Sequence, residues 1–136
     1  MLRFALAALV AAALLVPVAT AHDGHVHQAH DVAADAAPKI TGFRIEKAPA
    51  GGWTVLLDTA NFSFVPDTAA DAETNLGHAL LYINGTALAA LYAPIHHLDE
   101  LPFGPHDFRV VLNTRAQEEY AVAGRAIDAR LTLTVE

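Results

Sequence analysis

The sequence predicts a single all-β domain, an antiparallel β-sandwich of about seven strands and of immunoglobulin-like or cupredoxin-like type. Short runs rich in Val, Ile, Leu, Phe and Thr recur from residue 40 onwards, separated by turn sequences containing Gly, Pro or Asn. The last run, 126–135, alternates between apolar and polar residues, as a strand with one buried and one wet face does. No stretch of this part carries a long helical apolar repeat.

The strands are expected in a definite order. Residues 40–48 form the first, and 53–64 form one long strand or two joined by a bend, followed by an acidic loop at 66–76. Asn84-Gly85 then joins two apolar runs, and it predicts a β-hairpin because Asn-Gly accepts the positive φ angles of a type I′ turn. The remaining strands are predicted at 106–113, 120–122 and 126–135, after a short segment at 95–98 that Pro94 and Pro102 bracket.

The first 21 residues have the three parts of a secretory signal peptide. A short positive start ending at Arg3 precedes an almost wholly apolar run at 4–18, and Ala19-Thr20-Ala21 fits a cleavage site. The apolar run is short for a membrane span, and no cysteine is present to carry a lipid. We therefore expect a periplasmic or secreted protein with no membrane span after cleavage. An uncleaved N-terminal anchor is the alternative.

The net charge and the absence of cysteine and methionine exclude several classes of function. Cleavage removes Arg3, one of eight basic residues, and none of the 15 acidic ones, so the net charge falls from −7 to −8 with histidine neutral. Such an acidic domain is a poor partner for nucleic acid or an anionic membrane surface. Without Cys or Met in the mature chain, a metal would be held by imidazole, carboxylate, backbone or water. These ligands suit Cu(II), Zn(II) or Ni(II) and exclude a blue-copper site.

A histidine-rich stretch, HDGHVHQAHD, would begin the mature chain. It carries four candidate metal ligands: His22, His25, His27 and His30. Because no apolar periodicity accompanies them, we predict a flexible tail at 22–38 and place the folded domain at 39–136. The terminal amine and imidazole of His22 can chelate one ion, with a second histidine completing the plane that Cu(II) prefers. The alternative is a solvated tail that binds metals only loosely.

The predicted domain holds four more histidines: His78, His96, His97 and His106. His78 opens a hairpin strand, His97 follows the partner strand, and His106 begins a strand after a short connection, so these three are expected to meet at one end of the sandwich. His96 and His97 point in opposite directions in an extended chain, so at most one joins the site, and we choose His97. Asp99 or Glu100 is a candidate oxygen ligand. The alternative interpretation is that these histidines only cap the ends of strands and bind no metal.

The run ANFSF…GHALLYING…LYAPIHHL…PFGPHDFRVVLNT…EEYAVAGRAI resembles a poorly characterised family of small exported bacterial β-sandwich proteins. That family has the pattern NFxF…GHAHLYVNG…YxPWFHLP…GxHxxxVxLNxNDHxxYxxxGxxI, often beside a histidine-rich N-terminal stretch. The likeness covers residues 53–127 and implies a role in periplasmic metal handling, especially of copper. His78, His97 and His106 match the pattern's histidines. Leu80 and Gln117 replace two others, which implies a weakened body site and metal binding carried by the tail.

Catalysis has little support from the sequence. Ser63 is the only serine and lacks the flanking glycines of a nucleophile elbow, and neither an HExxH motif nor a glycine-rich phosphate loop occurs. The predicted function is a non-enzymatic exported carrier, buffer or sensor that binds Cu(II) or Zn(II) through histidines. The alternative is a non-catalytic sandwich that contacts another exported or membrane protein, with a tail that scavenges metal incidentally.

Overall fold

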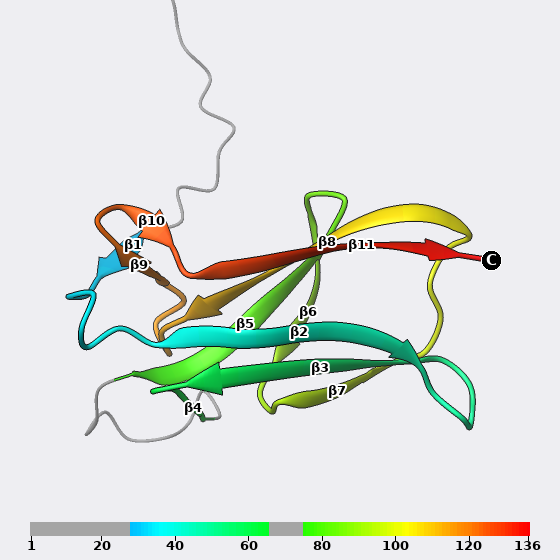
Figure 1. Cartoon of the computed structure of the whole chain (residues 1–136), viewed down its shortest axis with the longest axis horizontal. Helices are drawn as coiled ribbons and strands as arrows, with labels where there is room; N and C mark the ends of the chain where they lie inside the picture. Colours follow the sequence, from blue (N-terminus) through cyan, green and yellow to red (C-terminus); the bar gives the residue numbers. More distant parts are fainter. Residues whose placement is uncertain (1–27, 66–74) are drawn as a thin grey trace, which may run out of the picture.

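The computed structural model describes residues 28–65 and 75–136, and this part of the chain is all-β (Figure 1). It contains no helix, and so none long and apolar enough to cross a membrane. The predicted signal peptide and most of the predicted 66–76 loop lie outside the described residues. The strands are β1 (Ala29–Asp31), β2 (Lys39–Lys47), β3 (Trp53–Ala60), β4 (Ser63–Phe64), β5 (Leu76–Ile83), β6 (Thr86–Leu91), β7 (Ile95–Leu98), β8 (Gly104–Asn113), β9 (Glu119–Val122), β10 (Arg125–Ala126) and β11 (Asp128–Val135).

These strands form two sheets. The larger has eight strands along the path β1-β9-β8-β5-β4, with β10 beside β9, β11 beside β8 and β6 beside β5, and it curls into half of a barrel. The smaller has the order β2-β3-β7, and the two sheets meet where β2 packs on β11. Figure 1 shows β1, β9 and β10 together at one end of the molecule and the C-terminus at the other.

The prediction of an all-β fold is therefore confirmed, whereas the simple seven-strand sandwich is wrong. The run predicted at 53–64 divides into β3 and β4 because Asn61 adopts a left-handed φ of 55°, which no extended strand can contain. The strands β1, β4 and β10 have only two or three residues each. Segments this short carry no readable alternation, so a pattern search misses them.

The hairpin at Asn84-Gly85 is confirmed. Both turn residues have positive φ angles, 49° and 83°, and Ile83 pairs with Thr86 across the turn. This hairpin sets the register of the large sheet, because β5 pairs with β6 on one edge and with β8 on the other.

The core lies between the two sheets. Its fully buried side chains come from four strands: Val55 and Leu57 of β3, Ala79 and Leu81 of β5, Leu91 of β6, and Phe108, Val110 and Leu112 of β8. They occupy every second position, as the two-residue repeat of a strand requires. Burial of each large apolar side chain contributes roughly 1.5–3 kcal/mol, so this chain without cysteine has an apolar core in place of disulfides.

The prediction of a flexible tail at 22–38 needs correction from Gln28 onwards. Strand β1 pairs in parallel with β9, so that His30 lies opposite Tyr120, and Val32 N–H donates to the carbonyl of Ala121 at 2.8 Å. Ala37 and Pro38, which follow, are buried. The sequence did not reveal this strand, because three residues are too few to show a periodicity and the strand is defined only by its pairing with β9.

Candidate metal centre

The described residues include four of the seven predicted metal ligands, and the histidines of the domain do not converge. His22, His25 and His27 lie outside the described residues. Within residues 28–65 and 75–136, no group of three or more His, Asp or Glu side chains is arranged to hold a metal ion. The expected body site of His78, His97 and His106 is therefore not assembled.

The strand register explains why. His78 lies opposite Asn113 at the end of β8, whereas His106 lies near the beginning of the same strand. Seven residues of extended chain separate the two positions on β8, which corresponds to about 23 Å. His97 belongs to β7, which pairs with β3 in the other sheet. The chain changes sheets between β6 and β7, and this crossover removes His97 from the expected site.

Each of these three histidines has its own surroundings. The side chain of His78 is buried, and its ring lies 5.3 Å from the ring of Tyr92 between centroids. His97 is exposed, with Nε2 3.5 Å from Oδ1 of Asp99, one of the two candidate oxygen ligands from the sequence. This gives a pair of groups on the surface, and no third ligand completes it among the described residues.

His106 has a structural role. Its Nε2 donates a hydrogen bond to the carbonyl of Pro102 at 2.7 Å, and its Nδ1 accepts one from the amide nitrogen of Asn84 at 2.9 Å. The Asn84 amide is oriented by its oxygen, which accepts the backbone N–H of Asp107 at 2.9 Å. Both ring nitrogens are thus engaged, and His106 joins the hairpin turn to the segment before β8. A metal would have to break one of these bonds.

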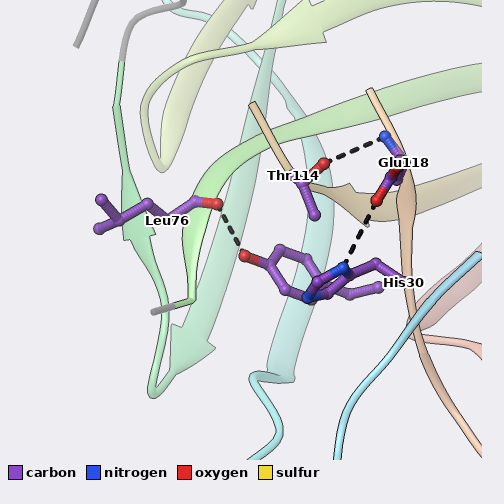
Figure 2. Close-up of polar contacts among 5 residues, drawn as sticks. His30, Leu76, Thr114 and Glu118 are labelled. Atoms are coloured by element: carbon purple, nitrogen blue, oxygen red, sulfur yellow. Dashed lines mark hydrogen bonds and ion pairs between the residues drawn. The ribbon is translucent and has the colours of Figure 1, made fainter. Parts of the chain in front are cut away.

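His30, like His97, lies beside a carboxylate. Its Nδ1 lies 3.4 Å from Oε2 of Glu118, and both side chains are partly exposed (Figure 2). The parallel pairing of β1 with β9 positions His30, and its ring packs edge-on against Tyr120 with 5.5 Å between centroids. The Tyr120 hydroxyl donates to the carbonyl of Leu76 at 2.8 Å, and burial raises the pKa of that hydroxyl.

Glu118 stands at the end of a tight turn between β8 and β9. Its backbone N–H donates to the Thr114 hydroxyl at 3.1 Å, as Figure 2 shows, and Thr114 N–H donates to the Glu118 carbonyl at 2.8 Å. Gln117 has the left-handed φ of 64° that such a turn requires. Sequence reasoning missed Glu118, because it is one acidic residue of a polar loop and has no meaningful spacing from the histidine stretch.

The geometry of this pair suits a metal ion. In a tetrahedral Zn(II) centre with bonds of 2.0–2.1 Å, two ligand atoms are about 3.3 Å apart, close to the 3.4 Å between the His30 and Glu118 atoms. The pair opens onto a pocket of about 580 Å³, to which Val32, Ala36 and Leu76 contribute apolar surface. Two ligands are provided by the described residues, and a stable site needs at least one more.

Comparisons with known proteins add no relative: no protein-family model matched the sequence, and neither a curated protein nor a solved structure was found to be similar. The resemblance to the exported bacterial family therefore stays an expectation from the sequence.

Proposed function

We propose that this protein is exported and binds Zn(II) or Cu(II) through its N-terminal histidines, as a carrier, buffer or sensor, without catalysing a reaction. The observation that carries the proposal is the 3.4 Å approach of His30 Nδ1 to Glu118 Oε2 on the surface of the domain. A histidine-rich stretch that is attached to a rigid strand beside a carboxylate has two of its ligands in place before the metal arrives, which lowers the entropy lost on binding.

The remaining ligands would come from the rest of the stretch. His27, His25 and His22 precede His30 by three, five and eight residues. Three residues of chain span at most about 10 Å, so the imidazole of His27 is within reach of an ion bound beside Glu118. An ion bound in this way would have mixed nitrogen and oxygen ligands, the set expected in a chain whose mature part has no cysteine or methionine.

The spacing of the pair favours Zn(II) at this position. Adjacent ligands in a square-planar Cu(II) site are about 2.9 Å apart, shorter than the observed 3.4 Å. A Cu(II) ion would be better served by the amine and imidazole of a free His22 terminus. The two metals can thus use different parts of the same stretch.

The test is a calorimetric titration of the mature chain, residues 22–136, with each metal. His30→Asn and Glu118→Gln are each expected to weaken Zn(II) binding by at least about tenfold, because each removes one metal ligand. His97→Asn and Glu100→Gln are matched controls on exposed residues and should bind as the wild type does. A variant with His22, His25 and His27 replaced by Asn tests the rest of the stretch.

Each result of the titrations tests a different part of the proposal. If His30→Asn and Glu118→Gln bind Zn(II) as tightly as the wild type, this pair is not a ligand pair. If the triple variant also binds normally, the whole stretch is excluded. Binding should weaken below about pH 6, because a metal requires neutral imidazole. Binding that persists unchanged at pH 5 would contradict ligation by histidine.

A second candidate function, contact with another exported or membrane protein, is favoured by one stretch of the chain. Leu88, Tyr92 and Ile95 are exposed apolar side chains within residues 86–97, a stretch that contains no Asp, Glu, Lys or Arg. Exposed apolar residues without nearby charges are typical of interaction sites. Loss of partner capture in an Ile95→Lys variant, with metal affinity unchanged, would favour this function.

A further inference from the structure

A row of three side chains crosses the outer face of the large sheet. In the strand register, Tyr82 of β5 lies opposite Arg109 of β8, and Arg109 lies opposite Arg130 of β11. Directly opposed residues project from the same face of a sheet with their Cβ atoms about 5 Å apart. Two guanidinium groups are therefore held as neighbours by the backbone. Next to this row, Asp107 lies opposite Thr132.

Arg109 is held in a defined orientation. Its Nε donates to Oδ2 of Asp128 at 2.7 Å, and its guanidinium carbon lies 5.9 Å from the centre of the Tyr82 ring. Arg130 reaches the same Asp128 oxygen only at 3.8 Å and is largely exposed. In the part of the chain that the structure describes, this is the only ion pair of the Arg130 side chain. One carboxylate is thus shared between two cations, which leaves N–H donors of Arg130 directed to solvent.

The row lines a hollow of about 850 Å³, with Gly85 of the hairpin turn and Thr132 among its other lining residues. Its lining has two arginines and one aspartate, Asp107. The pocket beside His30 has one arginine against one glutamate, and a third hollow has one lysine against three acidic residues. The lining of the hollow on the β5–β8–β11 face therefore has one more positive than negative side chain, in a chain whose formal charge is −7, and Asp128 is ion-paired to Arg109.

Like charges directly opposite each other in a sheet repel, and a single carboxylate, Asp128, lies within ion-pair distance of both guanidinium groups, at 2.7 Å from Arg109 and 3.8 Å from Arg130. The Asp107 carboxylate accepts a hydrogen bond from the Thr132 hydroxyl at 3.0 Å within the hollow. Planar guanidinium groups bind carboxylate and phosphate oxygens in pairs, and a group with a fixed orientation loses less entropy in doing so.

We propose that this hollow is a binding site for a small oxyanion, a carboxylate or a phosphate, held between the guanidinium groups of Arg109 and Arg130. The Tyr82 ring lines the same hollow beside Arg109. The site is separate from the candidate metal centre. Asn113 is the β8 residue that pairs with β9, the strand next to Glu118. Arg109 lies four residues before Asn113, which corresponds to about 13 Å of strand.

The experiment is a titration of the full mature chain with inorganic phosphate and, separately, with citrate, at constant ionic strength maintained by chloride. Passage over a chelating resin first removes metal ions, so that no phosphate binds through a metal. We expect saturable binding of at least one anion and at least about tenfold weaker binding by Arg130→Gln, because a charge-assisted bidentate contact is lost. The matched control is Arg125→Gln, an exposed arginine on β10, which should bind as the wild type does.

Preference for phosphate or citrate identifies which oxyanion the site takes. The proposal is overturned if neither anion binds saturably, or if Arg125→Gln weakens binding as much as Arg130→Gln does. Equal loss in both variants would mean that only the general charge of the protein matters. Arg109→Lys adds a second check, because it keeps the charge and removes the planar fork. Affinity equal to that of the wild type in this variant would exclude bidentate recognition. None of these results depends on whether the histidines bind metal.

Discussion

His78 and Asn113 lie directly opposite each other in the β5–β8 pair, and both side chains are buried. The amide nitrogen and oxygen of Asn113 have no hydrogen-bond partner in the structure as described. A buried amide without partners costs roughly 1–3 kcal/mol. This pair therefore places an energetically unfavourable polar group within the sheet, next to the pair Ala79–Leu112, whose side chains point to the opposite face and join the apolar core.

Replacement of this amide should stabilise the protein. Asn113→Leu replaces two unpaired polar atoms by methyl groups in the same branched shape, and it is expected to raise the free energy of unfolding by about 1 kcal/mol. Urea denaturation followed by circular dichroism measures the change.

The matched control for that substitution is Asn61→Leu. The Asn61 amide donates to the Ala36 carbonyl at 2.9 Å, and its φ of 55° suits asparagine, so leucine there should destabilise. If Asn113→Leu lowers stability as Asn61→Leu does, the Asn113 amide is hydrogen-bonded in the folded protein.

His106 should matter for stability and not for metal binding. His106→Ala removes the hydrogen bonds to Asn84 and Pro102 and is expected to lower the free energy of unfolding by about 1–3 kcal/mol. Its Zn(II) affinity should equal that of the wild type, because both ring nitrogens are already engaged. Calorimetry on the folded variant at low temperature separates the two effects. A tenfold loss of affinity with unchanged stability would reverse this assignment.

Tyr120 should contribute to stability in a pH-dependent way. Burial raises its pKa in the folded state, so the unfolded chain loses the phenol proton first as the pH rises. The stabilisation is complete below about pH 10, the pKa of an unperturbed tyrosine, and is lost as the pH rises through the folded pKa. The folded protein should therefore become less stable above about pH 10.

Tyr120→Phe tests this dependence. The variant lacks the hydrogen bond to Leu76 and should be less stable at pH 7 by about 1 kcal/mol. Its stability should fall less steeply above pH 10, although Tyr82, whose pKa is also raised by burial, keeps part of the slope. Denaturant midpoints at several alkaline pH values provide the measurement. Parallel curves for the two proteins would show that Tyr120 does not titrate with a shifted pKa.

The strand β1 should be part of the stable domain. A chain that begins at Gln28 keeps β1 and should unfold at the same denaturant concentration as one that begins at His22. A chain that begins at Ile40 loses the pairing of β1 with β9 and the buried Ala37 and Pro38. We expect it to be less stable by about 2 kcal/mol. Equal stability of all three chains would mean that β1 adds nothing to the domain.

Local chemistry explains which features the sequence predicts well. The Asn84-Gly85 turn is confirmed because the required positive φ angles depend on those two residues alone. The alternation in the last predicted strand is likewise confirmed in β11, whose exposed and partly buried residues alternate. The number of strands was wrong because β1, β4 and β10 are too short to show a pattern.

The arrangement of the candidate metal site, in contrast, could not be predicted from the sequence. The sequence indicated His30 as a candidate ligand, but the carboxylate beside it, Glu118, lies 88 residues further along the chain. Only the parallel pairing of β1 with β9 brings the two together. His78, His97 and His106 were grouped because they lie near strand ends, yet nothing in the sequence showed that β7 joins the other sheet.

By itself, the sequence determined the all-β class, the central hairpin and the kind of metal ligand that this chain can offer, because these follow from local conformational preference and side-chain chemistry. The tertiary structure decided which ligands meet. Strand register and the crossover between sheets separate the histidines of the domain and place His30 beside Glu118. Contacts between distant residues depend on how whole strands pair, and no short stretch of sequence contains that information.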